Sequence, residues 1–194
     1  MTAPKLLAFA GSLRRDSLNK KLVQAAAAAA RAAGAEVTLV DLADHPMPLF
    51  DLDVEAAGTP APALAFKALL KSHDGFLIAS PEHNSSYPAV LKNAIDWASR
   101  PAQGEPPLAA FAGKTAALLA ASPGALGGIR MLPELRRLLM NIRVFVLPDQ
   151  YGLGQAQQAF AADGTLSDPK QAAAVKAVAE ALVHTTRALR AARQ

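Results

Sequence analysis

The sequence contains no cysteine among its 194 residues. This absence excludes disulfide bonds, thiolate nucleophiles, cysteine-ligated zinc and iron–sulfur clusters, and it fits a reducing compartment. Aromatic residues are also scarce, at 5% of the chain, and no block of Lys and Arg is interleaved with them. Such blocks are typical of nucleic-acid-binding proteins, so we expect no nucleic-acid partner. The formal net charge of +4 favours anionic ligands only slightly.

Long apolar runs are absent as well. No stretch approaches the ~20 apolar residues of a membrane span. The run that starts at Leu6 is too short for a signal peptide and is followed by a charged loop. We therefore expect a cytoplasmic protein that does not bind membranes. The histidines are scattered without the spacing of metal ligands, so we expect no metal site; they are His45, His73, His83 and His184.

The composition and length fit one domain covering residues 1–194. A hydrophobic content of 52% is enough to fill a sizeable core. Apolar or β-rich segments predict strands at 6–10, 36–42, 76–80, 115–121 and 143–147, the last ended by Pro148. Helical patterns cover 18–33, 63–72, 89–99, 129–141 and the tail from 169. We expect the 63–72 helix to bury Leu64, Leu69 and Leu70, and residues 44–62 to form a long irregular loop.

The alternation of strands and helices predicts an α/β fold with a parallel sheet covered on both faces. Right-handed crossovers then give a doubly wound, flavodoxin-like sheet of five strands in the order 2-1-3-4-5. Ligands bind such sheets outside the carboxyl ends of the strands, at the switch point between strands one and three. The loops after strands one, three and four carry the unusual residues of the chain, so we expect one ligand site at this edge.

The loop after the first strand has the composition of a phosphate site. It runs from Gly11 to Asn19 and ends at the start of a helix, where unpaired N–H groups and the helix dipole favour an anion. Ser12, Arg14, Ser17 and Asn19 supply hydroxyl, guanidinium and amide donors. In the alternative interpretation, Asp16 or Ser17 only caps the helix and the arginines are solvated.

The other two loops suit a flat, polar ligand. The loop at 81–86 has few apolar groups to pack, so its N–H groups and Asn84 are available to the edge of a planar ring. The loop at 122–128 is rich in glycine and lacks side-chain bulk, so its backbone can approach such a ring closely.

Two motifs together resemble the NADPH-dependent FMN reductase family, and within it the bacterial chromate and quinone reductases. They are Gly-Ser-Leu-Arg-x-x-Ser-x-Asn at 11–19 and Pro-Glu-His-Asn-x-Ser-x-Pro-x-x-Leu-Lys-Asn-Ala-Ile-Asp-Trp at 81–97. The resemblance implies non-covalent FMN, with its phosphate on Ser12, Arg14, Ser17 and Asn19. It implies a ring site formed by Pro81, Glu82, His83, Asn84 and Ser86, with Ser122, Pro123 and Gly124 nearby. The chain departs from the family pattern at His83, where tyrosine is usual, and at Ala89, where glycine is usual.

The resemblance also implies a reaction. Hydride passes from NAD(P)H to the flavin, and the reduced flavin then reduces a quinone, a free flavin or another small oxidant. We expect no obligatory side-chain acid or base. We expect Glu82 to serve loop structure, with a proton-shuttle role for His83 as a minor alternative. The family further implies a homodimer or homotetramer.

Two other functions share the fold and the cofactor. A flavodoxin-like electron carrier is typically acidic, whereas this chain is basic. An FMN-binding scaffold would bind a partner without turnover. A receiver module has the same strand order, but it needs an acidic pair after strand one and an acceptor aspartate after strand three. Residues 11–12 and 80–81 lack these groups.

Overall fold

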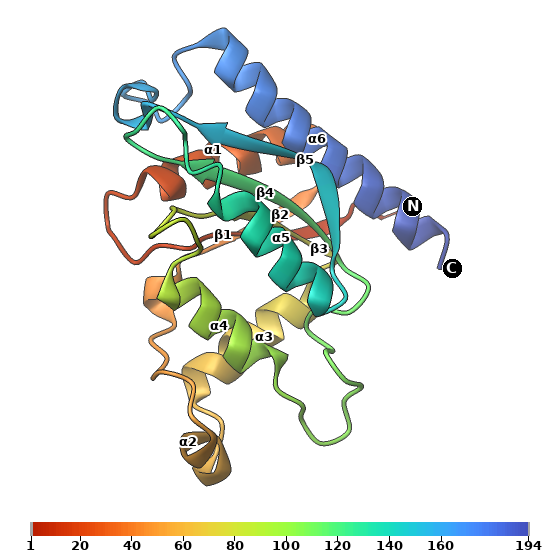
Figure 1. Cartoon of the computed structure of the whole chain (residues 1–194). Helices are drawn as coiled ribbons and strands as arrows, with labels where there is room; N and C mark the ends of the chain where they lie inside the picture. Colours follow the sequence, from red (N-terminus) through yellow and green to blue (C-terminus); the bar gives the residue numbers. More distant parts are fainter. Residues whose placement is uncertain (1, 194) are drawn as a thin grey trace.

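A computed structural model describes residues 2–193. Within these residues the chain forms a parallel sheet of five strands in the order β2-β1-β3-β4-β5, with helices on both sides (Figure 1). The predicted flavodoxin-like order is confirmed. The strands are β1 (Lys5–Ala10), β2 (Glu36–Val40), β3 (Gly75–Ala79), β4 (Thr115–Ala121) and β5 (Phe145–Leu153).

The helices form two layers because successive strand residues point to opposite faces of the sheet. On one face, Leu6 of β1 packs with residues of α1 and α6. On the other, Leu7 packs with α3, α4 and α5. The helices are α1 (Leu18–Ala32), α2 (Leu52–Ala57), α3 (Ala61–Ser72), α4 (Ala89–Ser99), α5 (Met131–Asn141) and α6 (Pro169–Ala191), with short 3₁₀ turns η1 (Leu42–Asp44) and η2 (Ala156–Gln158).

Burial follows strand position. Every residue of β3 and β4 is buried, because both central strands are covered on both faces. None of the residues of the edge strand β2 is buried, and even Leu39 is 40% exposed, so its sequence mixes polar and apolar residues. The apolar run of a central strand and the mixed pattern of an edge strand therefore have the same physical origin.

The predicted end of the last strand at Pro148 is wrong. β5 continues to Leu153, and Pro148 lies in a register irregularity between the pairs Ala116–Val146 and Leu118–Gln150. Proline has no N–H to donate, but an edge strand with an irregularity does not require one at that position. The extension brings a second half of β5 alongside the end of β4.

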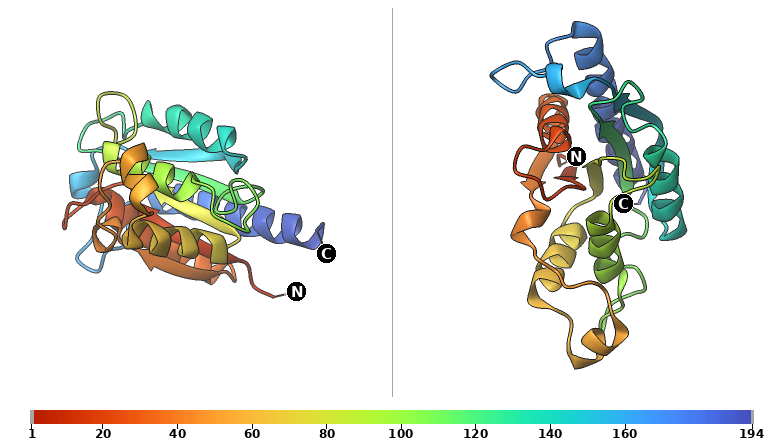
Figure 2. Two further views of the ribbon diagram at one scale, coloured as in Figure 1. Left: turned by 90° about the horizontal axis from the view of Figure 1, so that it is seen from below. Right: turned by 60° about the vertical axis from the view of Figure 1, so that its left-hand side comes forward.

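Two predictions for residues 44–72 also need correction. The expected irregular loop contains α2, whose first turn is capped by Asp51 accepting from the N–H of Asp53 at 2.7 Å. None of residues 52–57 is buried, and α2 projects from the body of the molecule (Figures 1 and 2). In α3, Leu64 is 49% exposed, whereas Leu70 is buried as expected and Lys67 is buried beside it.

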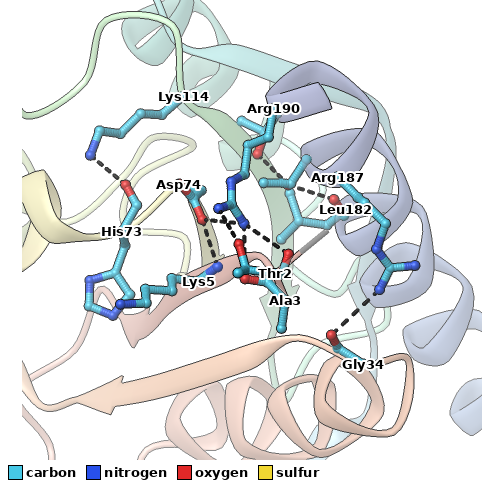
Figure 3. Close-up of polar contacts among 12 residues, drawn as sticks. Thr2, Ala3, Lys5, Gly34, His73, Asp74, Lys114, Leu182, Arg187 and Arg190 are labelled. Atoms are coloured by element: carbon cyan, nitrogen blue, oxygen red, sulfur yellow. Dashed lines mark hydrogen bonds and ion pairs between the residues drawn. The ribbon is translucent and has the colours of Figure 1, made fainter. Parts of the chain in front are cut away.

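Helix α6, near the end of the chain, contacts the residues that precede β1. Arg190 donates to the carbonyl oxygen of Ala3 at 2.9 Å and to Oγ1 of Thr2 at 3.0 Å, and it pairs with Asp74 at 3.3 Å (Figure 3). These contacts lie at the amino end of the sheet, opposite the predicted ligand edge. Across residues 2–193, no helix combines the length and the apolar character that crossing a membrane requires.

Candidate active site

The first loop presents two buried serine hydroxyls at the start of α1. Oγ of Ser17 accepts from the N–H of Lys20 at 3.4 Å and caps the helix, and Oγ of Ser12 accepts from the N–H of Arg14 at 3.3 Å. Because each oxygen serves as an acceptor in these contacts, its O–H proton remains available for a ligand. The capping role of Ser17 and an anion site at this loop are therefore compatible.

The charges around this loop are partly neutralised by the protein itself. Lys20 pairs with Asp41 at 2.5 Å, which joins α1 to the end of β2. Burial acts to raise the pKa of Asp41, but hydrogen bonds from Lys20 and from the N–H of Ala43 hold this pKa below its ordinary value. Arg14 is exposed and extends the donor set of the loop toward solvent.

The first and second loops leave the sheet in close contact. The N–H of Gly11 donates to the carbonyl oxygen of Ala79 at 2.9 Å. A Cβ at position 11 would lie 2.6 Å from Oγ of Ser80, which is buried. Glycine at the end of β1 is thus required by the approach of β3, so the two loops start side by side.

The second loop contains a tight hairpin that the sequence analysis did not predict. His83 and Ser86 exchange two backbone hydrogen bonds of 2.9 and 3.0 Å. Between them, Asn84 has φ 50° and Ser85 has φ 67°, the signature of a type I′ turn. Asparagine tolerates this conformation, but serine in place of glycine hides the usual pattern. The turn places Asn84 and Ser85 at an exposed tip.

Glu82 joins the second loop to the third. Its Oε2 accepts from the N–H groups of Arg130 and Met131 at 3.0 and 3.3 Å, and its Oε1 accepts from Nε of Arg130 at 2.7 Å. The side chain of Glu82 is only 9% exposed. A carboxylate at the first turn of α5 satisfies free N–H groups and complements the helix dipole. The role in loop structure predicted for Glu82 is confirmed.

A hollow of about 450 Å³ lies between the second and third loops. Four of the residues predicted for the flavin line it, namely Glu82, Asn84, Ser122 and Gly124. Ser85 lines it as well, because the type I′ turn places it beside Asn84. The complete lining is Glu82, Asn84, Ser85, Ser122, Gly124, Ala125, Leu126, Gly128 and Arg130.

The other predicted residues lie around this hollow or away from it. Pro81, His83, Ser86 and Pro123 belong to the same two loops but do not line it. Ala125, Leu126 and Gly128 also line it; they belong to the loop at 122–128 that was expected to approach the ring, although none of them was named as a flavin residue. Arg130 lines it too and was not predicted for the flavin. The glycine-rich stretch at 122–128 was the only signal in the sequence for this part of the site. Leu126 is 60% exposed, so the rim of the hollow has apolar surface.

The glycines of the third loop have different roles. A Cβ at Gly127 would lie 2.7 Å from the carbonyl carbon of Gly152 in β5, and Gly127 has φ +62°. At Gly124 the nearest atom to an added Cβ is Oγ of Ser122, at 3.5 Å. Gly127 therefore serves the docking of the loop on β5, whereas Gly124 leaves open space beside the hollow. Of these two glycines, Gly124 is therefore the one whose backbone is open to the close approach of a ligand.

The side chain of Asn19 does not simply face the first loop. It is buried and forms two hydrogen bonds with the backbone of Ala121, at 2.9 and 2.8 Å. The carboxamide thereby spans from α1 to the end of β4. The prediction that Asn19 offers its side-chain amide to a phosphate overlooked this contact, which joins residues 102 positions apart.

The pattern that defines the NADPH-dependent FMN reductases matches residues 4–158 of this chain. The chain belongs to the NADPH-dependent FMN reductase family. The match includes all three loops of the site, and it identifies the chain as an oxidoreductase that uses FMN and NAD(P)H.

Relatives of this FMN reductase cover almost its whole length. It is 38% identical over 187 residues to an NAD(P)H-dependent FMN reductase of Pseudomonas aeruginosa, covering 96% of this chain and 97% of the relative. It is 36% identical over 184 residues to an NAD(P)H:quinone oxidoreductase of Solanum tuberosum, covering 92% and 90%. Among solved structures, it is similar to FerB, a flavoenzyme NAD(P)H:(acceptor) oxidoreductase of Paracoccus denitrificans, with a TM-score of 0.82, 30% identity and coverage of 95% and 98%.

Proposed function

We propose that the three loops hold FMN non-covalently, with the phosphate at the first loop and the ring at the hollow between the second and third. The observation that carries this assignment is the pair of buried hydroxyls of Ser12 and Ser17, whose oxygens already accept hydrogen bonds from the backbone. Their protons, the free N–H groups of the first turn of α1 and the guanidinium of Arg14 form a donor set that fits a phosphate dianion.

The residues of the hollow fit a flat polar ring. Asn84 and Ser85 stand at the tip of the type I′ turn, and Gly124 leaves its backbone open on the opposite side. Bound FMN supplies the hydride-accepting and hydride-donating chemistry. The side chains of the two loops orient the ring and leave its outer side accessible. Because Glu82 is held by Arg130 and two N–H groups, we assign it no proton transfer.

We infer that the acceptors are quinones and similar small oxidants. The exposed Leu126 at the rim of the hollow favours a planar, partly apolar acceptor over a strongly hydrated anion. The relatives include enzymes named for quinone reduction, which supports this class. The use of NAD(P)H as reductant is consistent with an enzyme located in the cytoplasm.

We also propose a homo-oligomer. Leu49 is 77% exposed and Leu52 is 64% exposed, and both lie on the projecting segment around α2. Large apolar side chains gathered on a projecting segment are typical of a surface that is covered by a partner.

The proposal is tested by the visible spectrum of FMN-reconstituted, desalted protein before and after anaerobic NADPH. We expect a retained flavin band that bleaches within seconds and returns on addition of a quinone. A retained band that NADPH does not bleach would support the electron carrier or the scaffold instead. Arg14→Ala should weaken FMN retention, and Arg15→Ala, at the neighbouring exposed position, is the matched control that should retain it.

A further inference from the structure

The carboxamide of Asn19 connects two parts of the site that are distant in sequence. Asn19 is 2% exposed. Its Nδ2 donates to the carbonyl oxygen of Ala121 at 2.9 Å, and its Oδ1 accepts from the N–H of the same residue at 2.8 Å. Asn19 lies in the first turn of α1, next to the first loop, and Ala121 is the last residue of β4, next to the third loop. One side chain therefore joins the two loops.

The order of the strands explains why this contact exists. β3 lies between β1 and β4 (Figure 1), and it ends at Ala79. Just after this end, the N–H of Ser80 donates to the carbonyl oxygen of Leu119 at 3.0 Å. Ala121 is two residues further along β4, so its peptide groups point to the same side, beyond the end of β3. Because β3 has already ended there, the side chain of Asn19 pairs the N–H and the carbonyl oxygen of Ala121. The burial of these two groups without partners would be costly.

We propose that Asn19 is a positioning residue that fixes the loop at 122–124 relative to the first loop and so acts on the flavin ring. This inference rests on the flavin site proposed above. The two contacts, to the N–H and to the carbonyl oxygen of Ala121, fix the plane of the carboxamide. They set the start of the third loop against the helix that carries the phosphate site. Loss of the side chain therefore affects the ring contacts, with the phosphate donors left in place.

Riboflavin separates this role from direct phosphate binding, because it has the ring of FMN but no phosphate. We expect Asn19→Ser to weaken binding of both flavins to the full chain by the same factor, about tenfold, since the buried N–H and carbonyl oxygen of Ala121 lose their partners. The ratio of the two affinities should stay at its wild-type value. Arg14→Ala should instead lower the affinity for FMN alone. A loss confined to FMN in Asn19→Ser would make Asn19 a phosphate ligand and overturn the proposal, as would unchanged binding of both flavins.

Asn93 offers a matched control. Its Nδ2 donates to the carbonyl oxygen of Pro48 at 2.8 Å and its Oδ1 accepts from the N–H of Phe50 at 2.7 Å, so it bridges backbone in the same way but outside the three loops. Asn93→Ser should lower the stability and leave both flavin affinities unchanged. Equal losses of flavin binding in Asn93→Ser and Asn19→Ser would overturn the proposal, because the effect would then be one of general stability.

A measurement on the unaltered chain covers the case in which Asn19→Ser does not fold. We expect the amide hydrogen of Ala121 to be protected from exchange in flavin-free protein, because Oδ1 of Asn19 already holds it. Exchange as fast as that of an unstructured amide would overturn the proposal. A wild-type chain that folds but binds neither FMN nor riboflavin would overturn the proposed flavin site, and this inference with it. In that chain, protection of the Ala121 amide from exchange would still show the hydrogen bond between Ala121 and Asn19.

Discussion

Glu82 and Arg130 lie 48 positions apart and hold two loops of the site together, with Oε1 of Glu82 accepting from Nε of Arg130 at 2.7 Å. The same carboxylate accepts from the N–H groups that begin α5. The arginine is 58% exposed, whereas the glutamate is 9% exposed. The strength of the contact therefore comes chiefly from the buried carboxylate and the backbone groups that it satisfies.

Replacement of this carboxylate tests that view. Glu82→Ala leaves the N–H of Arg130 without its acceptor, and the N–H of Met131 keeps only the carbonyl oxygen of Gly128. We therefore expect the free energy of unfolding to fall by about 1–2 kcal/mol. Urea denaturation measures the change. Arg137→Ala removes an exposed ion pair of 2.8 Å with Glu134 and should change stability by less than about 0.5 kcal/mol. Equal effects of the two substitutions would contradict the role given to Glu82.

The third loop offers a pair of glycine substitutions with different outcomes. Gly127→Ala places a Cβ 2.7 Å from backbone of Gly152 at a φ of +62°, so we expect a loss of stability above about 1 kcal/mol. Gly124→Ala meets its nearest atom at 3.5 Å, and the fold should tolerate it. FMN affinity should nevertheless fall in Gly124→Ala if the flavin contacts that backbone. Thermal unfolding and flavin titration separate the two effects, and a stable Gly127→Ala would refute the packing argument.

The type I′ turn predicts a stabilising substitution. Ser85 has φ 67°, a conformation that glycine adopts without the steric cost paid by other residues. We expect Ser85→Gly to raise the free energy of unfolding by about 0.5 kcal/mol, after the greater freedom of glycine in the unfolded chain is included. Ser85→Val should act in the opposite direction, because a β-branched residue is strained there. Chemical denaturation at one pH decides whether the two shifts have opposite signs.

Lys114 predicts a dependence of stability on pH. Its Nζ donates to the carbonyl oxygens of Leu70, Lys71 and His73 at the end of α3. Burial lowers the pKa of Lys114 from its ordinary 10.5 to about 8, with Asp74 opposing this shift and Lys71 adding to it. Between these two values the unfolded chain binds more protons than the folded chain, so the free energy of unfolding rises with pH.

The measurement compares urea denaturation of the wild type and Lys114→Met from pH 7 to 11. We expect the difference in stability between the two proteins to grow across the window from about pH 8 to 10.5. Lys170→Met, at an exposed position of α6, is the control for removal of a positive charge. Parallel profiles of the wild type and Lys114→Met would contradict the lowered pKa.

The sequence was sufficient to predict the sheet and the three loops at the carboxyl ends of its strands, because their causes are local. A continuous apolar run such as 115–121 requires cover on both faces, and the alternation of such runs with helices leaves few possible topologies. The sequence also predicted a phosphate site at Ser12, Arg14 and Ser17, because they lie where a helix start follows a strand end. This assignment stays a prediction.

The remaining features depend on contacts that a local pattern does not contain. Pro148 continues a strand only because β5 is an edge with a register irregularity. Lys67 is buried in place of Leu64 because its Nζ finds the carbonyl oxygen of Arg100 and the carboxylate of Glu105, both at 2.8 Å. The contact between Asn19 and Ala121 depends on where β3 ends. Each of these is set by the tertiary partner.

The contacts of Arg190 with Thr2 and Ala3 have a practical consequence for attaching this enzyme to a surface. Both ends of the described chain lie at the amino end of the sheet, and the candidate active site lies at the carboxyl end. An electrode linker at either terminus would therefore leave the three loops facing the electrolyte, and it would put the length of the strands between the conductor and the flavin. Direct electron transfer from such an electrode should be slow, so a diffusing quinone would carry the current.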